Sequence, residues 1–213
     1  MKYPITFFFA LFIISINTIF SQDMVFCGEL TYSIVLVKRP YSAVPKEWED
    51  KIFAPKMRKI LIKDSLLNSS VCLMNGDLDY FEYQCYDIGY LMGKDKQKIS
   101  LNSVPGNLHA MQLIQKTDNK KNILGIPCKK YIYRASGNKY VVWIPINFIF
   151  NDQRKYGRVF DTIFFPHGLA FEINIYIDND KDELCTTSKL LKLELKNLSN
   201  EDFEQFARTY KKQ

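Results

Sequence analysis

The feature that most constrains this fold is a strict alternation of apolar and polar residues. In its clearest stretch one parity carries Phe171, Ile173, Ile175 and Ile177, and the other carries Glu172, Asn174 and Tyr176. Successive side chains of a β-strand point to opposite faces of a sheet, whereas a helix buries every third or fourth residue. This period of two therefore predicts a strand with one buried face, and its recurrence along the chain predicts a mainly β protein.

Several other segments have the same strand character. They are residues 24–37, 60–62, 70–74, 80–86, 98–101, 111–115, 128–134, 139–144 and 191–196. Turn-forming residues separate some of them, as at Asn75-Gly76 and at residues 135–138. The lysine-rich residues 116–122 are expected to be a polar connection, and residues 145–168 to be irregular. Strands joined by such short turns are expected to be antiparallel.

One short helix is expected early in the chain. Pro45 suits its first turn, Trp48 and Ile52 stand four residues apart on one side, and Pro55 should end it.

A second short helix is expected at the end of the chain. Ser199 followed by Asp202 marks its start. Its inner stripe is Phe203, Phe206 and Tyr210. Long antiparallel strands with one polar face, together with the early helix, imply a strongly curved sheet packed around that helix.

The first residues have the character of an export signal. Lys2 precedes a short apolar run, and small or polar residues follow at Thr18 and Ser21-Gln22, which is the order of a secretory signal peptide. The run is shorter than the roughly 20 apolar residues of a membrane span. We expect residues 1–22 to be a signal peptide cleaved near Ser21-Gln22, and residues 23–213 to be a single β-rich domain. The mature chain, periplasmic or secreted, is then expected to carry no transmembrane segment.

The net charge and the cysteine content say less about partners and disulfides than the alternation says about the fold. The net charge of +6 is spread along the chain, so it indicates no nucleic-acid partner. The five cysteines are Cys27, Cys72, Cys85, Cys128 and Cys185. An exporting compartment permits disulfides, but an odd number leaves at least one thiol unpaired. Cys72 and Cys85 flank the Asn75-Gly76 turn and are the natural pair, although a two-residue turn would place Asp79 opposite Cys72.

The sequence contains no recognised catalytic or metal-binding signature. Its two histidines, His109 and His167, have no second histidine or Cys-x-x-Cys partner at ligand spacing. The acidic residues 178–182 lack the glycine and glutamate that a calcium loop needs, so a solvated turn is expected. Cys128 and His167 would form a nucleophilic pair only if the fold brought them together. We therefore expect no catalytic residue, no metal, no cofactor and no enzymatic activity.

Aromatic residues are the feature with most functional weight. The chain has 16 Phe and 13 Tyr, which either fill the core of the sheet or line a cavity for an acyl chain. The candidates for the second role are Trp48, Ile52, Trp143, Phe148, Phe150, Phe164 and Phe165.

Three sequence segments carry a family resemblance. Residues 26–32 read FCGELTY, residues 123–132 read ILGIPCKKYI, and residues 140–145 read YVVWIP. Together they resemble the exported GLPGLI and DUF4412-type proteins of Bacteroidota. The Gly-Leu-Pro-rich turn of those families is matched loosely by residues 165–171, in which Pro166 precedes Gly168. The resemblance implies the LolA-like half-barrel of lipoprotein carriers, whose curved sheet encloses a hydrophobic cavity, and it brings no functional residue with it.

Two functions follow as expectations. The first is an exported envelope protein that binds a hydrophobic ligand, either a lipid or a lipidated partner, without catalysis. The alternative is a cell-envelope protein-protein interaction module whose sheet is filled by its own side chains. A continuous cavity would favour the first, and a solid interior with an exposed apolar patch would favour the second.

Overall fold

The computed structural model describes a defined part of the chain. That part is residues 24–25, 27–37, 54–63, 67–85, 88–93, 98–100, 111–135, 137–149, 164–177 and 183–211. Only the backbone is described for residues 24–25, 67–70, 80–85, 88–93, 98–100, 149, 164 and 211. The expected signal peptide, the expected early helix with Trp48 and Ile52, and the candidate Phe150 lie outside the described residues.

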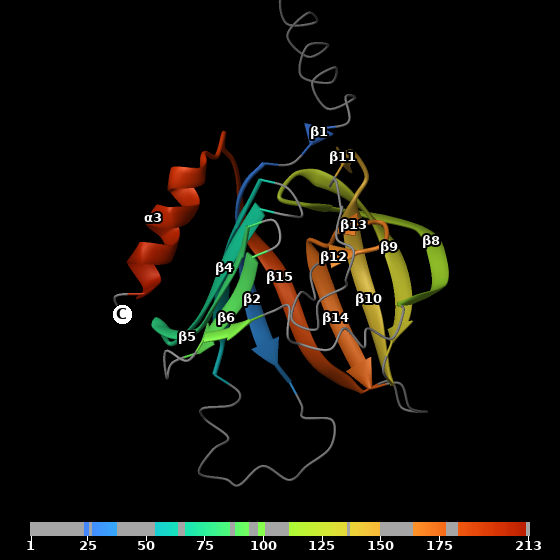
Figure 1. Cartoon of the computed structure of the whole chain (residues 1–213). Coiled ribbons are helices and arrows are strands. Elements are labelled where there is room, and N and C mark those ends of the chain that lie inside the picture. The colour runs from blue at the N-terminus through green and yellow to red at the C-terminus, as the bar shows by residue number, and fades with distance from the viewer. Residues whose placement is uncertain are drawn as a thin grey trace, which may run out of the picture.

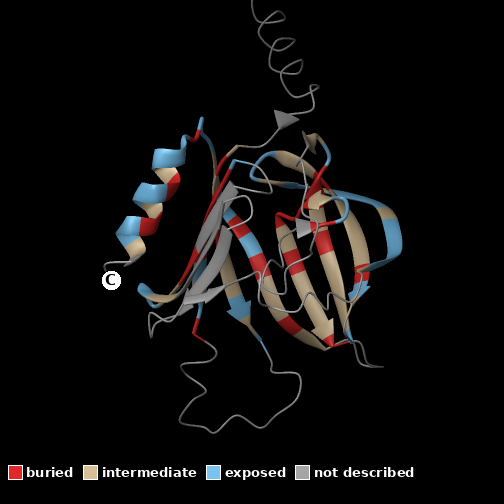
Figure 2. Cartoon of the chain, viewed as in Figure 1, coloured by how far each residue is buried: buried red, intermediate tan, exposed pale blue. Residues whose placement is uncertain are grey.

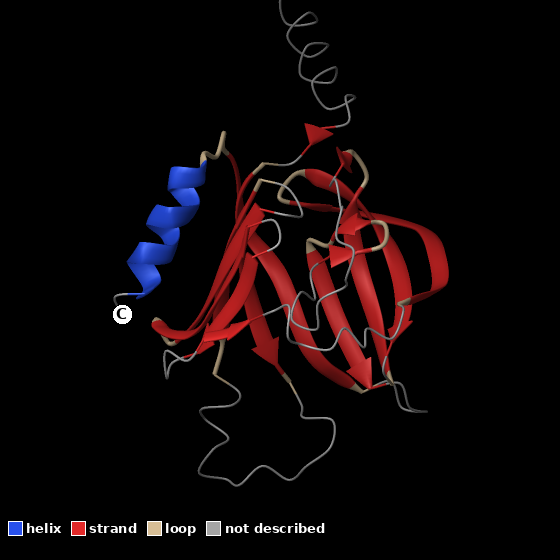
Figure 3. Ribbon diagram, in the orientation of Figure 1, coloured by secondary structure: helices blue, strands red, loops and turns tan. Residues whose placement is uncertain are grey.

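One open antiparallel sheet of eleven strands dominates the described part (Figures 1 and 3). The strands are β2 (Gly28–Leu36), β3 (Lys56–Ile62), β4 (Leu67–Met74), β5 (Asp77–Cys85), β6 (Ile88–Gly93), β7 (Lys98–Ser100), β8 (Gln112–Ile123), β9 (Ile126–Ala135), β10 (Asn138–Pro145), β14 (Glu172–Ile177) and β15 (Leu184–Leu195). Their order across the sheet is β7-β6-β5-β4-β3-β2-β15-β14-β10-β9-β8. The predicted mainly β, antiparallel architecture is confirmed.

Two small strand pairs and one helix complete the described part. β1 (Met24–Val25) runs parallel to β11 (Phe148–Ile149), and β12 (Phe164–Phe165) pairs with β13 (Gly168–Leu169) in a tight hairpin. The helix α3 (Asn200–Lys211) follows the last strand. The sheet is curved, and α3 lies against its outside, beside β4 and β5 (Figure 1). We call the face covered by α3 the outer face and the opposite one the inner face.

The alternation in the sequence separates these two faces. In β3, Ile60 and Ile62 are buried in the core of the inner face, whereas Leu61 between them packs with α3 on the outer face. In the stretch that ends in β14, Phe171, Ile173 and Ile177 are buried as predicted, and Figure 2 shows the resulting alternation of burial along the central strands. The inner-face core comprises Leu30, Tyr32, Ile60, Ile62, Tyr133, Val142, Ile144, Phe165, Leu169, Ala170, Phe171, Ile173 and Leu190, and it is continuous with Cys128, which has the parity of Lys130 on the other side of β9.

The helix α3 begins and packs as the sequence predicts. The Asp202 carboxylate accepts hydrogen bonds of 2.7 Å from both the backbone N–H and the hydroxyl of Ser199. A carboxylate in the first turn also suits the positive end of the helix dipole. Phe203 is 1% exposed against Leu61, so the apolar stripe of the helix faces the sheet.

Gly28 allows the first and last long strands to approach closely. A Cβ built at this position would lie 2.0 Å from the carbonyl oxygen of Glu194 on β15. No side chain fits at that distance, so β2 and β15 can pair here because residue 28 is glycine.

Three strand predictions need correction. Residues 116–122, expected to be a connection, are part of β8, and β6 was not predicted. In β15 the register shifts between Leu190 and Lys192. Because of this bulge Leu190 is buried, whereas Leu191, which the simple alternation placed on the apolar side, is 51% exposed.

The predicted Cys72–Cys85 pair is contradicted by the register of its two strands. Cys72 lies opposite Tyr80, and Cys85 lies opposite Leu67. Five residues of extended strand separate the two positions along β4, about 16 Å, which is far beyond the reach of a disulfide. The Asn75-Gly76 turn forms as expected, and a register shift beyond Cys72 puts Tyr80 rather than Asp79 opposite it.

Candidate functional site

An aromatic cluster on the inner face is the most distinctive group of side chains in the described part. It consists of Tyr131 and Tyr133 on β9, Tyr140 on β10, and Phe165 and His167 from the β12–β13 hairpin. The Phe165 ring centroid lies 5.3 Å from that of Tyr133 and 6.0 Å from that of Tyr140. The His167 ring lies 4.5 Å from the Tyr131 ring. These separations are typical of aromatic pairs that stabilise a core.

Two hairpins bring the cluster together. The pairing of Asn138 with Ala135 sets Tyr140 opposite Tyr133, on the same face of adjacent strands. In the second hairpin Phe165 pairs with Gly168, so Pro166 and His167 form a two-residue turn. Gly168 has φ of +128°, and a Cβ there would lie 3.3 Å from Ile144 Cγ2. Glycine thus suits both the backbone conformation and the close contact with β10.

The hairpin is also fixed at its base. The Tyr32 hydroxyl on β2 donates a 2.9 Å hydrogen bond to the carbonyl of Ala170. The Phe171 N–H donates to the Trp143 carbonyl, and the Phe171 carbonyl accepts from Leu190 N–H, each at 2.8 Å. These three bonds join the chain after β13 to β2, β10 and β15, so they hold the base of the hairpin.

One polar contact ties the tip of the hairpin to the sheet. The Tyr133 hydroxyl and His167 Nδ1 are 2.6 Å apart. Tyr133 is fully buried whereas His167 is exposed. Burial raises the pKa of Tyr133 well above its usual value near 10, so its hydroxyl stays protonated. The pKa of His167 is lowered, first by its partial burial and then by the positive charge of Lys116.

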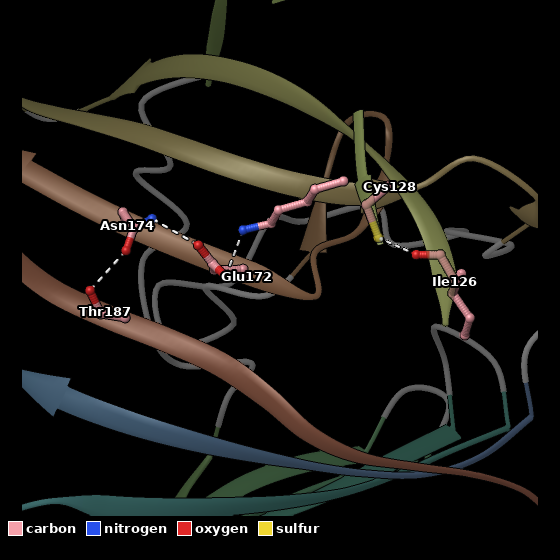
Figure 4. A network of polar contacts seen from close by, with 6 residues as sticks. Ile126, Cys128, Glu172, Asn174 and Thr187 are labelled. Carbon is pink, nitrogen blue, oxygen red and sulfur yellow. Dashed lines mark hydrogen bonds and ion pairs between the residues drawn. The ribbon is translucent and has the colours of Figure 1, made fainter. Parts of the chain in front are cut away.

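A second polar group lies on the outer face (Figure 4). Lys121 Nζ contacts Glu172 Oε2 at 2.7 Å and sits 4.4 Å from the centroid of the Trp143 ring. Asn174 Nδ2 donates to Glu172 Oε1 at 3.3 Å, and Thr187 Oγ1 donates to Asn174 Oδ1 at 2.8 Å. The Glu172 side chain, which is 16% exposed, thus receives a charge-assisted bond from Lys121 and an amide bond from Asn174.

A bulge in β8 brings Lys121 to this group. β8 and β14 are separated by β9 and β10, about 14 Å in three strand spacings. Lys116 lies opposite Tyr131 and Lys120 opposite Lys129, so three residues of β8 face one residue of β9. Such extra residues bend a strand, and here the end of the β8–β9 hairpin turns toward β14 and Lys121 reaches Glu172.

Cys128 is not an activated thiol. It is fully buried, and its Sγ contacts the Ile126 carbonyl at 3.5 Å (Figure 4). Burial raises its pKa to about 12, against a smaller opposing effect of Lys121, whereas a nucleophilic cysteine needs a lowered pKa. Cys128 also lies five residues along β9 from Tyr133, the partner of His167. The structure therefore does not form a Cys128–His167 pair.

The candidate ligand-binding residues are not brought together by the described structure. Phe165 belongs to the aromatic cluster, and Phe148 packs against Phe171 with ring centroids 5.8 Å apart. Trp143 lies opposite Lys130 and Glu172, on the outer face. For Phe164 only the backbone is described, and Trp48, Ile52 and Phe150 lie outside the described residues.

Sequence reasoning missed the three tyrosines of the cluster. Tyr131 and Tyr133 share one parity of β9, and Tyr140 has the matching parity on β10. That shared parity was the available signal.

The described residues carry neither a metal-binding cluster nor a membrane-spanning helix. Among the described residues, no group of three or more His, Cys, Asp or Glu side chains is arranged to hold a metal ion. In that part of the chain no helix has the length and apolar character needed to cross a membrane.

Comparison with known proteins shows the fold. A chain in the structure of the Pseudomonas aeruginosa MucA/MucB complex is similar, with a TM-score of 0.50 and 8% identity over 88% of this chain. The present chain spans 58% of that chain. A putative outer membrane lipoprotein-sorting protein domain from Vibrio parahaemolyticus has a TM-score of 0.37 and 11% identity, over 92% of this chain and 97% of that domain.

Comparison of sequences adds no family. No family model matches the chain, and no curated protein matches it. The resemblance to the GLPGLI and DUF4412-type proteins therefore stays a prediction.

Proposed function

We propose that this protein is a non-catalytic binding protein of the bacterial cell envelope and that its partner is another protein. The observation that carries this proposal is the filling of the inner face. Tyr133, Val142, Phe165, Leu169 and Phe171 are at most 3% exposed there. Over β9, β10 and β14 the inner face is thus occupied by the protein's own side chains, as expected for a module that binds through its surface.

Location and fold support the same proposal. An export signal in residues 1–22 would deliver the chain to the periplasm or beyond. The similar fold in the MucA/MucB structure comes from an assembly of two proteins, which is a precedent for a protein partner on this scaffold.

An apolar patch on the outer face is the surface we assign to the partner. Val35 and Met57 have 39% and 41% of their surface exposed, and the register places both on this face. Met57 lies opposite Leu73, which packs beneath α3. The apolar surface that α3 covers therefore continues past the helix, and an apolar segment of a second protein would extend the same packing.

The test uses protein purified from its own host without denaturant. Native mass spectrometry of the wild-type chain is expected to show a stoichiometric protein partner and no bound lipid. Met57→Glu should weaken that complex at least tenfold, because a charge would enter an apolar contact. Leu124→Glu is the matched control, since Leu124 is 50% exposed in the turn after β8. Equal effects of the two variants would contradict the assignment of the patch.

Binding of a hydrophobic ligand, either a lipid or a lipidated protein, is the second candidate. The half-buried rings of Tyr131 and Tyr140 at the border of the aromatic cluster favour it, because such rings suit the wall of an acyl-chain site. The same spectra decide between the two candidates. A lipid mass on the purified chain, without a protein partner, would support the second and overturn the first.

A further inference from the structure

Burial favours one direction for the hydrogen bond between Tyr133 and His167. The buried Tyr133 hydroxyl needs an acceptor for its proton, and among the described residues its hydrogen-bond partner is His167 Nδ1 at 2.6 Å. When the hydroxyl donates to Nδ1, that nitrogen is unprotonated and the neutral ring carries its proton on Nε2. The contact as it stands requires neutral His167.

Protonation of His167 removes the acceptor. Both ring nitrogens of a protonated imidazole are donors, so two donors would face each other across 2.6 Å. The Tyr133 hydroxyl would have to rotate and accept from Nδ1–H. Its own proton would then point into the apolar side chains around it, where an unsatisfied donor is costly.

The other groups that face His167 do not favour its protonation either. From β8, Lys116 adds a positive charge that opposes protonation. From β9, Tyr131 stacks on the ring and Tyr133 contacts Nδ1, and neither side chain is a carboxylate. The described interactions of His167 thus include no carboxylate that would stabilise the imidazolium in place.

We propose that the Tyr133–His167 contact is a proton-sensitive latch, and that protonation of His167 releases the tip of the β12–β13 hairpin from the inner face. The movement is local, because the Tyr32–Ala170 bond and the backbone bonds of Phe171 still hold the base. Release of the tip uncovers the rings of Tyr131 and Tyr133. This inference does not depend on the identity of the partner.

The first measurement follows the state of His167 directly. The chain has two histidines, so NMR of ¹⁵N-histidine-labelled full-length His109→Gln protein leaves His167 as the one signal. We expect the Nε2–H tautomer at neutral pH and a pKa below about 6.5. Tyr133→Phe should raise that pKa, since it removes the donor that favours the neutral ring. Tyr131→Phe is the matched control, because it keeps the stacked ring, and it should leave the tautomer unchanged.

The second measurement follows the hairpin. Gly168 packs on Ile144 Cγ2, so a nuclear Overhauser effect should join the Gly168 α-protons to this methyl group. It should be strong at neutral pH and fall several-fold once the pH is below the His167 pKa that the first measurement gives. His167→Gln, which is neutral throughout, should keep one intensity at both pH values. An Ile144 signal that stays constant while His167 titrates would overturn the latch, as would an unchanged His167 pKa in Tyr133→Phe.

Discussion

The two faces of the sheet are packed in different ways. On the outer face α3 covers β3, β4 and β5 with apolar side chains spaced one helical turn apart, Phe203, Phe206 and Tyr210. On the inner face, rings from two separate stretches of chain meet, and the contact includes the buried Tyr133 hydroxyl. The outer contact is formed by a single amphipathic helix that packs on the sheet. The inner contact depends on several elements at once, so the loss of one ring should disturb more of the molecule.

The largest expected effect belongs to the inner face. Phe171→Ala removes a fully buried ring that packs on Phe148, and such truncations cost about 3–5 kcal/mol. The free energy of unfolding from urea titration measures it. Leu195→Ala, at a position 53% exposed, should cost less than about 0.5 kcal/mol. Similar costs for the two variants would mean that the inner core is not closely packed.

The corresponding truncation of a buried ring on the outer face should lower the free energy of unfolding by less. Phe203→Ala removes the ring that anchors α3, and about 3 kcal/mol is expected, because a helix at the periphery can shift to fill part of the space. Glu204→Ala on the exposed side of the same helix is the control. The His167 NMR signal should be unaffected. A change in that signal would show that the two faces are coupled through the sheet.

The latch hydrogen bond should contribute a smaller amount. Tyr133→Phe is expected to cost about 1 kcal/mol at neutral pH, since the freed His167 Nδ1 is close to water. The lowered pKa of His167 means that its contribution is fully present above the unfolded-state value and is lost as pH falls through the folded-state value. In Tyr133→Phe this pH dependence should be weaker. Equal slopes in urea titrations of both proteins below pH 6.5 would contradict the assignment.

The smallest effect should come from the start of α3, in a different pH window. The Ser199 backbone N–H, and then its hydroxyl, hold the pKa of Asp202 below 3.8. The contribution of this carboxylate is therefore present above that pH and lost as pH falls through the folded-state pKa. Circular dichroism of the wild type should show loss of helix only in this acidic range. Asp202→Asn should lose a little helix at neutral pH and show no further step there.

Local patterns predicted most of the sheet and all of α3. The period of two located β2, β10 and β14, and the Ser199–Asp202 pair located the start of the helix. β8 was predicted only in part because it lies at the edge of the sheet and most of its side chains are exposed. Because neither face of β8 is buried, its sequence does not need to alternate apolar and polar residues. Its lysine-rich stretch therefore resembles a loop.

Non-local packing explains what sequence reasoning could not reach. The bulge at Leu190–Lys192 reverses the parity of β15, and no single residue there signals it. The aromatic cluster depends on a hairpin inside a segment expected to be irregular, which folds back over β9 and β10. Phe165 was recognised as a candidate, but its neighbours were set by which strands became adjacent.

The two bulges of β8 also affect how this molecule meets copies of itself. β8 is an edge strand, and a regular exposed edge strand of this length could pair with a strand of another molecule. Here the ladder is interrupted at two places, and the ammonium groups of Lys116 and Lys120 stand along it. The same extra residues that direct Lys121 toward Glu172 therefore make β8 a poor template for the intermolecular strand pairing that fibrils require.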